Sequence, residues 1–321
     1  MRTLIKLRSG SILTAAALAV SASLLTFAAP ANAATDAAAA PAVPVAAASS
    51  MPPIPQVTLH RGPAQVEPAA VTPQRGAQQI RQAPLVANMT YHGGPVTHQP
   101  RVYLVFWGTQ WQSNPNGAAS YMYYYFQGLG QPADNWSPIM SQYTDATGQG
   151  PTFGVSALAG AVIDNSPVPF AATAAQIAAE AVAGANYFGS FGTDSQVFVL
   201  SPSGAHPAGF PTSGFCAYHS ATTDALGRFV AFTNMPYVLD AGTACAANSV
   251  RSPLDGFSII GGHEYAETIT DVALNAWYDT NLAGEIGDKC QTGPFFAQTL
   301  PTGVFAQQML WSNAANGCVQ F

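Results

Sequence analysis

Three short apolar runs stand out in the middle of the chain. Residues 101–108, 196–201 and 228–232 are rich in β-branched and aromatic side chains, and a glycine ends the first run. Continuous apolar runs of this length are typical of strands that are buried on both faces of a sheet. We therefore predict that these segments form three central strands.

Helical segments are expected between and after these runs. Residues 118–129 are rich in aromatic side chains, and residues 172–185 are rich in alanine. A third helix should run from Ser252-Pro253, a favourable N-cap and first-turn pair, to about Thr270. Residues 203–226, rich in Gly, Pro and Ser, predict a long loop. Helices interleaved with buried strands predict a single layered α/β domain with a mixed, partly parallel sheet.

The N-terminal part of the chain has a different composition. Residues 1–33 contain the basic start, the apolar run and the small-residue cleavage site Ala31-Asn32-Ala33 of a secretory signal peptide. An uncleaved membrane anchor is the alternative for such a run, but the polar, alanine-rich sequence that follows favours removal. Residues 34–87, rich in Ala, Pro and Gln, predict a disordered linker or pro-segment. We expect the folded domain over residues 88–321 in a secreted, extracellular or periplasmic protein with no stable membrane anchor.

Acidic residues dominate the predicted domain. Three basic and fourteen acidic residues follow Arg101, which gives this part of the chain a net charge of −11. Nucleic acid and anionic membrane are polyanions, so this charge argues against both as partners. The expected partner is an extracellular protein, a peptide or a wall polymer.

The chain has four cysteines, an even number that predicts two disulfide bonds in an exported protein. Three pairings are possible. We favour Cys216–Cys245 and Cys290–Cys318, because each closes a local loop of about thirty residues and contributes about 3–4 kcal/mol of stability.

The most informative motif lies in the third predicted helix, at His263-Glu264-Tyr265-Ala266-Glu267. His263 and Glu267 stand four apart, so they share one helical face and can bind one metal ion. Glu264 has the position of the general base in the zinc hydrolase motif H-E-x-x-H. Here glutamate replaces the second histidine of that motif. Zinc can bind the carboxylate oxygen of glutamate in place of an imidazole nitrogen. The alternative is a solvated helix face that carries two acids.

A third metal ligand could come from the acidic segment that follows the helix. Glu285 and Asp288 lie 22 and 25 residues beyond His263, which is about the separation at which some zinc peptidases place an acidic ligand. Both are candidates, and the alternative for both is a solvated acidic turn beside a disulfide. A site with one histidine and two carboxylates binds zinc less tightly and leaves manganese and calcium in contention. His219, near Cys216, is a further candidate as a ligand or as a donor to the transition state.

Four blocks of the sequence resemble the EXORDIUM/phosphate-induced protein family of secreted plant proteins and their bacterial relatives. The blocks occur in the family's order and lie at residues 94–108, 215–219, 263–290 and 311–318. The third block is the most specific and includes His263, Glu267 and Cys290. Val272 follows Asp271 where the family usually has proline. The resemblance implies an extracellular protein, associated in plants with the cell wall and growth, and it implies no particular reaction.

Two functional hypotheses follow from these residues. The first is a secreted, zincin-like zinc metallopeptidase in which His263, Glu267 and either Glu285 or Asp288 bind the metal. Glu264 would accept a proton from the metal-bound water, whose pKa the ion lowers. The second is a non-catalytic extracellular protein that binds cell-wall polymer or another partner, with a structural metal or none.

Overall fold

The computed structural model describes residues 51–61, 87–280 and 284–321. The predicted signal peptide, residues 1–33, lies outside the described residues, as does most of the predicted linker. None of the helices in the described ranges combines the length and the apolar character that crossing a bilayer requires.

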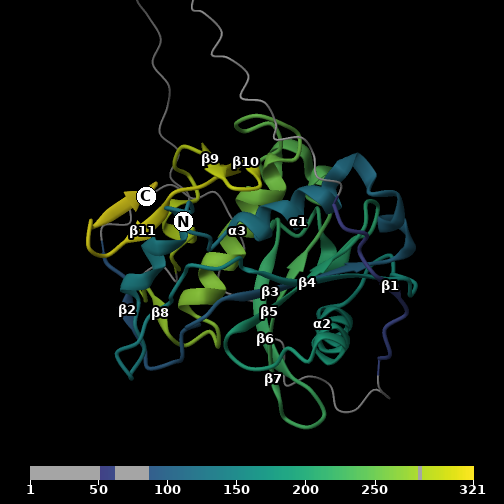
Figure 1. Cartoon of the computed structure of the whole chain (residues 1–321), viewed down its shortest axis with the longest axis horizontal. Helices are drawn as coiled ribbons and strands as arrows, with labels where there is room; N and C mark the ends of the chain where they lie inside the picture. Colours follow the sequence, from purple (N-terminus) through teal and green to yellow (C-terminus); the bar gives the residue numbers. More distant parts are fainter. Residues whose placement is uncertain (1–50, 62–86, 281–283) are drawn as a thin grey trace, which may run out of the picture. The chain divides into compact units, whose positions relative to one another are not determined.

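A six-stranded sheet forms the centre of the domain (Figure 1). Its strands, in spatial order, are β1 (Gln56–Val57), β4 (Leu158–Asp164), β3 (Arg101–Trp107), β5 (Ser195–Leu200), β7 (Phe229–Met235) and β6 (Tyr218–Thr223). The first five are parallel to one another, and β6 is antiparallel to β7. The prediction of an α/β domain with a mixed sheet is therefore confirmed. The three predicted central strands are β3, β5 and β7.

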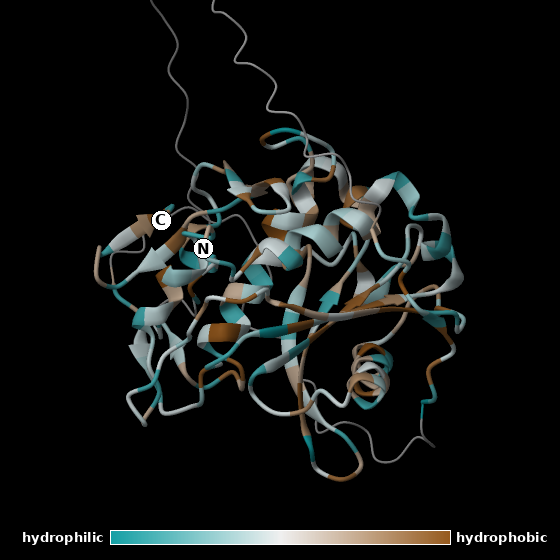
Figure 2. Cartoon of the chain, viewed as in Figure 1, coloured by the Kyte–Doolittle hydropathy of each residue, from teal (hydrophilic) through white to brown (hydrophobic). Residues whose placement is uncertain are grey.

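Helices cover both faces of this sheet (Figure 1). α2 (Ala174–Phe188) packs on one face, while α1 (Ala118–Gly128) and α3 (Asp255–Thr270) pack on the other. The alternation of side chains along β3 explains this arrangement, because successive residues point to opposite faces. Leu104 belongs to the core beneath α1 and α3, and Val105 belongs to the core beneath α2. Hydrophobic residues accordingly line the strands of the sheet (Figure 2).

The helix α3 begins at Asp255, two residues after the predicted first helical residue, Pro253. The side chain of Asp255 accepts hydrogen bonds from the backbone N–H groups of Val250 (2.7 Å) and Arg251 (2.6 Å). These bonds fold residues 250–254 into a turn ahead of the helix. Every residue of α3 is buried, so this helix is a central element of the fold and not a solvated one.

Short elements surround α3. They are the strand pairs β2 (Thr90–Tyr91) with β8 (Trp277–Tyr278), β9 (Phe296–Leu300) with β10 (Gly303–Gln307), and β11 (Leu310–Ser312) with β12 (Gly317–Val319). Short 3₁₀ helices span Thr109–Ser113, Pro115–Gly117, Ser137–Gln142, Pro207–Gly209, Val238–Cys245 and Asp288–Cys290.

Both predicted disulfide bonds, Cys216–Cys245 and Cys290–Cys318, are present in the structure. The first joins the segment before β6 to the segment before α3. The second joins the loop that carries Asp288 to β12. Each bond therefore fixes a segment that leads to a candidate site residue.

The segment 203–226 is not a continuous loop, because its last part forms β6. This strand places His219 inside the protein, where it is fully buried. Thr222 and Thr223 are β-branched residues that favour a strand, but the glycines and prolines before them obscured that signal in the sequence.

Residues 51–61 correct the prediction of a disordered segment over residues 34–87. Gln56 and Val57 pair with Ile163 and Asp164 as a parallel edge strand. Arg61 then reaches Asp164 (2.9 Å) and Glu180, two carboxylates that are fully buried. Main-chain pairing, the ion pair of Arg61 and the burial of Ile54 and Leu59 in the two cores hold this stretch in place. The rest of the predicted linker, apart from Ala87, lies outside the described residues.

Candidate metal centre

The helix α3 presents His263 and Glu267 to each other, one turn apart. Glu267 Oε1 lies 3.0 Å from His263 Nε2, and both side chains are almost completely buried. The motif was expected either to bind a metal or to form a solvated helix face. Burial of the whole helix is incompatible with the solvated face.

Gln308 sets the orientation of the His263 ring. Its side-chain nitrogen donates to the carbonyl oxygen of Gly287 (3.0 Å), which directs its side-chain oxygen toward His263 Nδ1 (3.3 Å). This contact favours a proton on Nδ1, so that Nε2, which faces Glu267, is the ring nitrogen that would bind an ion once it loses its own proton. Metal-binding histidines commonly have this arrangement, in which one ring nitrogen donates to an oxygen and the other faces the ion.

The loop after β8 brings Asp288 to the same ring nitrogen. Asp288 Oδ1 lies 3.6 Å from His263 Nε2, and the Asp288 backbone N–H donates to Glu267 Oε1 (3.1 Å). Lys289 secures this loop, because its ammonium group lies 3.0 Å from the buried carboxylate of Asp279. His263, Glu267 and Asp288 are close enough together to share one metal ion.

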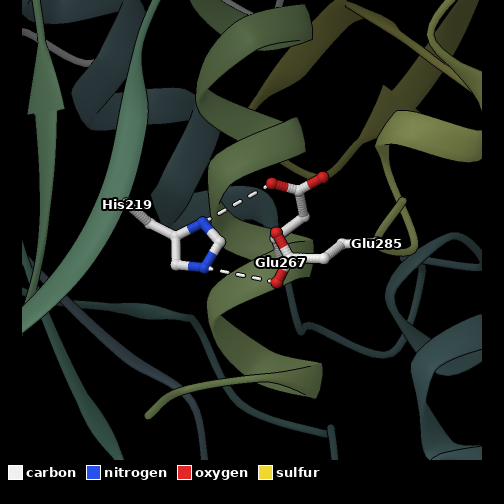
Figure 3. A group of neighbouring side chains, drawn as sticks. All are labelled: His219, Glu267 and Glu285. Atoms are coloured by element: carbon white, nitrogen blue, oxygen red, sulfur yellow. Dashed lines mark ion pairs between the residues drawn. The ribbon is translucent and has the colours of Figure 1, made fainter. Parts of the chain in front are cut away.

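His219 reaches the centre from β6, and its ring faces the carboxyl groups of Glu267 and Glu285 (Figure 3). Its Nδ1 lies 3.5 Å from Glu267 Oε2 and 3.4 Å from Glu264 Oε2. Its Nε2 lies 3.6 Å from Glu285 Oε1. His219, Glu267 and Glu285 form a second group whose ligand atoms could hold an ion.

The structure thus brings together all six residues that the sequence singled out, and it separates the two acids that were alternatives. Asp288 lies with His263, whereas Glu285 lies with His219. Among the described residues, these are the two groups of three or more such side chains that could hold an ion. The roles of the six residues remain predictions.

Three neighbours of the site were not anticipated from the sequence. Gln308 orients His263, and Gly287 leaves room for the ring of that histidine. Asp271, at the end of α3, interacts with the carboxyl group of Glu285. Single glutamine, glycine and aspartate residues carry no recognisable motif, so the sequence offered little signal for them.

Two glycines precede the motif, and one of them is required by packing. A Cβ at position 262 would lie 2.3 Å from the hydroxyl oxygen of Tyr125 and 2.7 Å from the side-chain oxygen of Gln307. Gly262 therefore lets α1 and β10 approach α3 closely. At Gly261 the nearest atom, in Met122, would be 3.3 Å away, so the requirement is weaker there.

In the absence of a metal, the buried ionisable groups of the centre strongly shift one another's pKa values. Burial alone would lower the pKa of His263, but Glu267 beside it raises that pKa to about 10. Burial alone would raise the pKa of Glu267, but His263 lowers it to about 2. Burial and the charge of Glu267 raise the pKa of Asp288 to about 8. Burial also raises the pKa of Glu264 and that of Glu285.

These shifts describe a centre in which protons balance the buried carboxylates. Glu267 is held ionised between two histidines, whereas burial shifts the pKa of each of the other three acids upward. A divalent cation would take the place of those protons, because metal ligands bind in their deprotonated forms. The donor set of imidazole and carboxylate suits zinc and manganese better than it suits soft metals.

Comparison of the chain with protein-family models, with curated proteins and with solved structures finds no significant match.

Proposed function

We propose that this protein is a secreted metal-dependent hydrolase, a zincin-like peptidase whose ion is bound by His263, Glu267 and Asp288. The observation that carries the proposal is the convergence of Glu267 and Asp288 on the Nε2 atom of His263, whose other ring nitrogen faces Gln308. A bound zinc ion would polarise a substrate carbonyl group and lower the pKa of water.

Glu264 is the general base in this proposal. Its Oε2 atom is buried and accepts no hydrogen bond of ordinary geometry from the described residues, although His219 Nδ1 lies 3.4 Å away. Burial raises the pKa of Glu264, which makes its carboxylate a better proton acceptor than an exposed one. Glu264 is also next to His263 in the chain, so it is held beside the metal ligands by the same helix.

A second candidate function is favoured by the burial of the site. The six side chains are at most 9% exposed, as expected of an ion with a structural role. In that case the protein would bind a wall polymer or another extracellular partner through a different surface. Either candidate would be an exported protein that resembles the EXORDIUM/phosphate-induced family. Export and this resemblance are inferred from sequence patterns alone.

Metal analysis of the purified protein tests the metal centre, and a peptide-cleavage assay separates the two candidates. A hydrolase should contain zinc or manganese, cleave peptides, and lose activity when a chelator removes the ion. A structural centre should contain the ion and melt at lower temperature without it, but show no chelator-sensitive cleavage. A protein that binds neither ion contradicts both versions of the metal centre.

A further inference from the structure

Glu267 is shared by the two groups of candidate ligands, and it offers a different oxygen atom to each. Oε1 lies 3.0 Å from His263 Nε2, and Oε2 lies 3.5 Å from His219 Nδ1. Each histidine therefore contacts a different oxygen atom of the same carboxylate. A carboxylate that binds one ion through each oxygen is a natural bridge in two-metal hydrolases, whose ions lie about 3.5–4 Å apart.

Each group also has an acid of its own. Asp288 Oδ1 lies 3.6 Å from His263, and Glu285 Oε1 lies 3.6 Å from His219. The result is two sets of one histidine and one unshared carboxylate, and both sets include Glu267. Figure 3 shows the set that contains His219 and Glu285. The second set includes a strand residue, His219, and does not depend on the helical motif.

The number of acids favours two ions over one. Glu264, Glu267, Glu285 and Asp288 bring four carboxyl groups into a buried centre, next to a fifth buried acid, Asp271, and the two histidines are neutral when they bind metal. One divalent cation would balance two carboxylates, and the other acids would have to keep their protons. Two cations would balance all four groups of the centre without those protons.

The buried carboxyl group of Glu264, which is not one of the proposed ligands, also favours a second ion. Its buried Oε2 atom lacks a well-formed hydrogen bond among the described residues and is directed to the side of the centre on which His219 lies. A buried carboxylate oxygen without such a bond costs free energy unless something else satisfies it. An ion with its bound water in the second group would do so.

We propose that the centre binds two divalent transition-metal cations bridged by Glu267, the first with His263 and Asp288 and the second with His219 and Glu285. This inference rests on the proposed function only in requiring that the first set binds an ion. It assigns His219 to metal binding and leaves Glu264 as the base beside the two ions.

The number of ions per chain tests the inference. The protein is saturated with Zn²⁺, dialysed, and analysed by mass spectrometry for zinc and by amino-acid analysis for protein. We expect two ions in the wild type, and one in each of Glu285→Gln and Asp288→Asn. Glu180→Gln is the matched control, because Glu180 is a buried glutamate outside the centre, and it should retain two ions.

A spectroscopic measurement makes the test independent of how well the variants fold. Two Mn²⁺ ions that share a carboxylate are magnetically coupled, whereas a single ion gives an uncoupled six-line spectrum. Wild-type protein loaded with Mn²⁺ should show the coupled signal, and Glu285→Gln should show the uncoupled one.

The outcomes distinguish this inference from the proposed function. One ion in the wild type, retained in Glu285→Gln and lost in Asp288→Asn, would overturn the two-ion centre and leave the metal-dependent hydrolase standing. Two ions retained in Glu285→Gln would place the second ion elsewhere and would also overturn the inference. No bound ion in the wild type would overturn both proposals.

Discussion

Gly287 lies against the face of the His263 ring, so closely that a Cβ at position 287 would be 2.6 Å from Nδ1. The same glycine accepts a hydrogen bond from Gln308 through its carbonyl oxygen (3.0 Å). One residue without a side chain therefore both makes room for the histidine and fixes the amide that orients it.

Replacing this glycine should displace the ring. In Gly287→Ala the added methyl group cannot fit beside His263, so we expect a loss of about 1–3 kcal/mol in the free energy of unfolding. Metal affinity should fall about 10- to 100-fold, as it does when a group that orients a ligand is lost. Gly317→Ala is the control, because its nearest neighbour would be 3.9 Å away. Titration with a chromogenic chelator measures the affinity, and equal values for the two variants would contradict this role.

Glu264 and Glu267 should respond differently to the same substitution. Glu264→Gln keeps the volume of the side chain but cannot accept a proton, so hydrolysis should fall about 10²- to 10⁴-fold while bound metal is retained. Glu267→Gln removes the central ligand and should lose metal and thermal stability together. Metal analysis, melting temperature and a peptide-cleavage assay measure these effects. If the two variants behave alike, the division of roles is wrong.

Metal binding should strengthen as the pH rises. The pKa of His263 is raised to about 10 and that of Asp288 to about 8, and both groups must lose their protons before they can bind an ion. Each proton released makes the affinity up to about tenfold greater per pH unit below the pKa of its group. Competition titrations at about pH 6, 7 and 8 would show this trend. An affinity that stays constant over this range would contradict it.

Arg61 should be needed for stability although it lies in a segment predicted to be disordered. Arg61→Ala would leave the buried carboxylate of Asp164 without its cation and would remove the hydrogen bond that Arg61 donates to Glu180 (2.8 Å). The guanidinium group is 32% exposed, so we expect a partly screened loss of about 1–3 kcal/mol in urea unfolding. The exposed Arg251 is the control, and Arg251→Ala should change stability by less than about 0.5 kcal/mol.

Glu180 should make the protein lose stability as the pH rises from its ordinary pKa of 4.5 to about 8. Burial raises the pKa of Glu180 to about 8, although Arg61 lowers it in part. The unfolded chain releases this proton near its ordinary pKa of 4.5, whereas the folded protein retains it to about pH 8. The free energy of unfolding should therefore fall as the pH rises through this interval. Glu180→Gln should flatten that dependence in urea titrations, and an unchanged slope would contradict the assignment.

Local patterns allowed part of the site to be predicted. The spacing of His263 and Glu267 determines their contact because helical geometry acts within one turn. The division of Glu285 and Asp288 between two histidines could not be predicted, because it depends on a loop conformation and on where β6 joins the sheet. The buried strands were recognisable by their apolar runs. β1 was not, since its order comes from backbone pairing with a strand about a hundred residues later.

That pairing has a consequence for how the protein behaves in solution. A β-strand at the edge of a sheet exposes unpaired backbone groups that can recruit a strand of another chain. β1 covers this edge of β4, and Arg61 holds the covering strand in place. A chain that starts at residue 87 would leave the edge of β4 open, and we expect it to self-associate where the longer protein does not. We therefore expect residues 51–61 to reduce aggregation by covering the edge of β4.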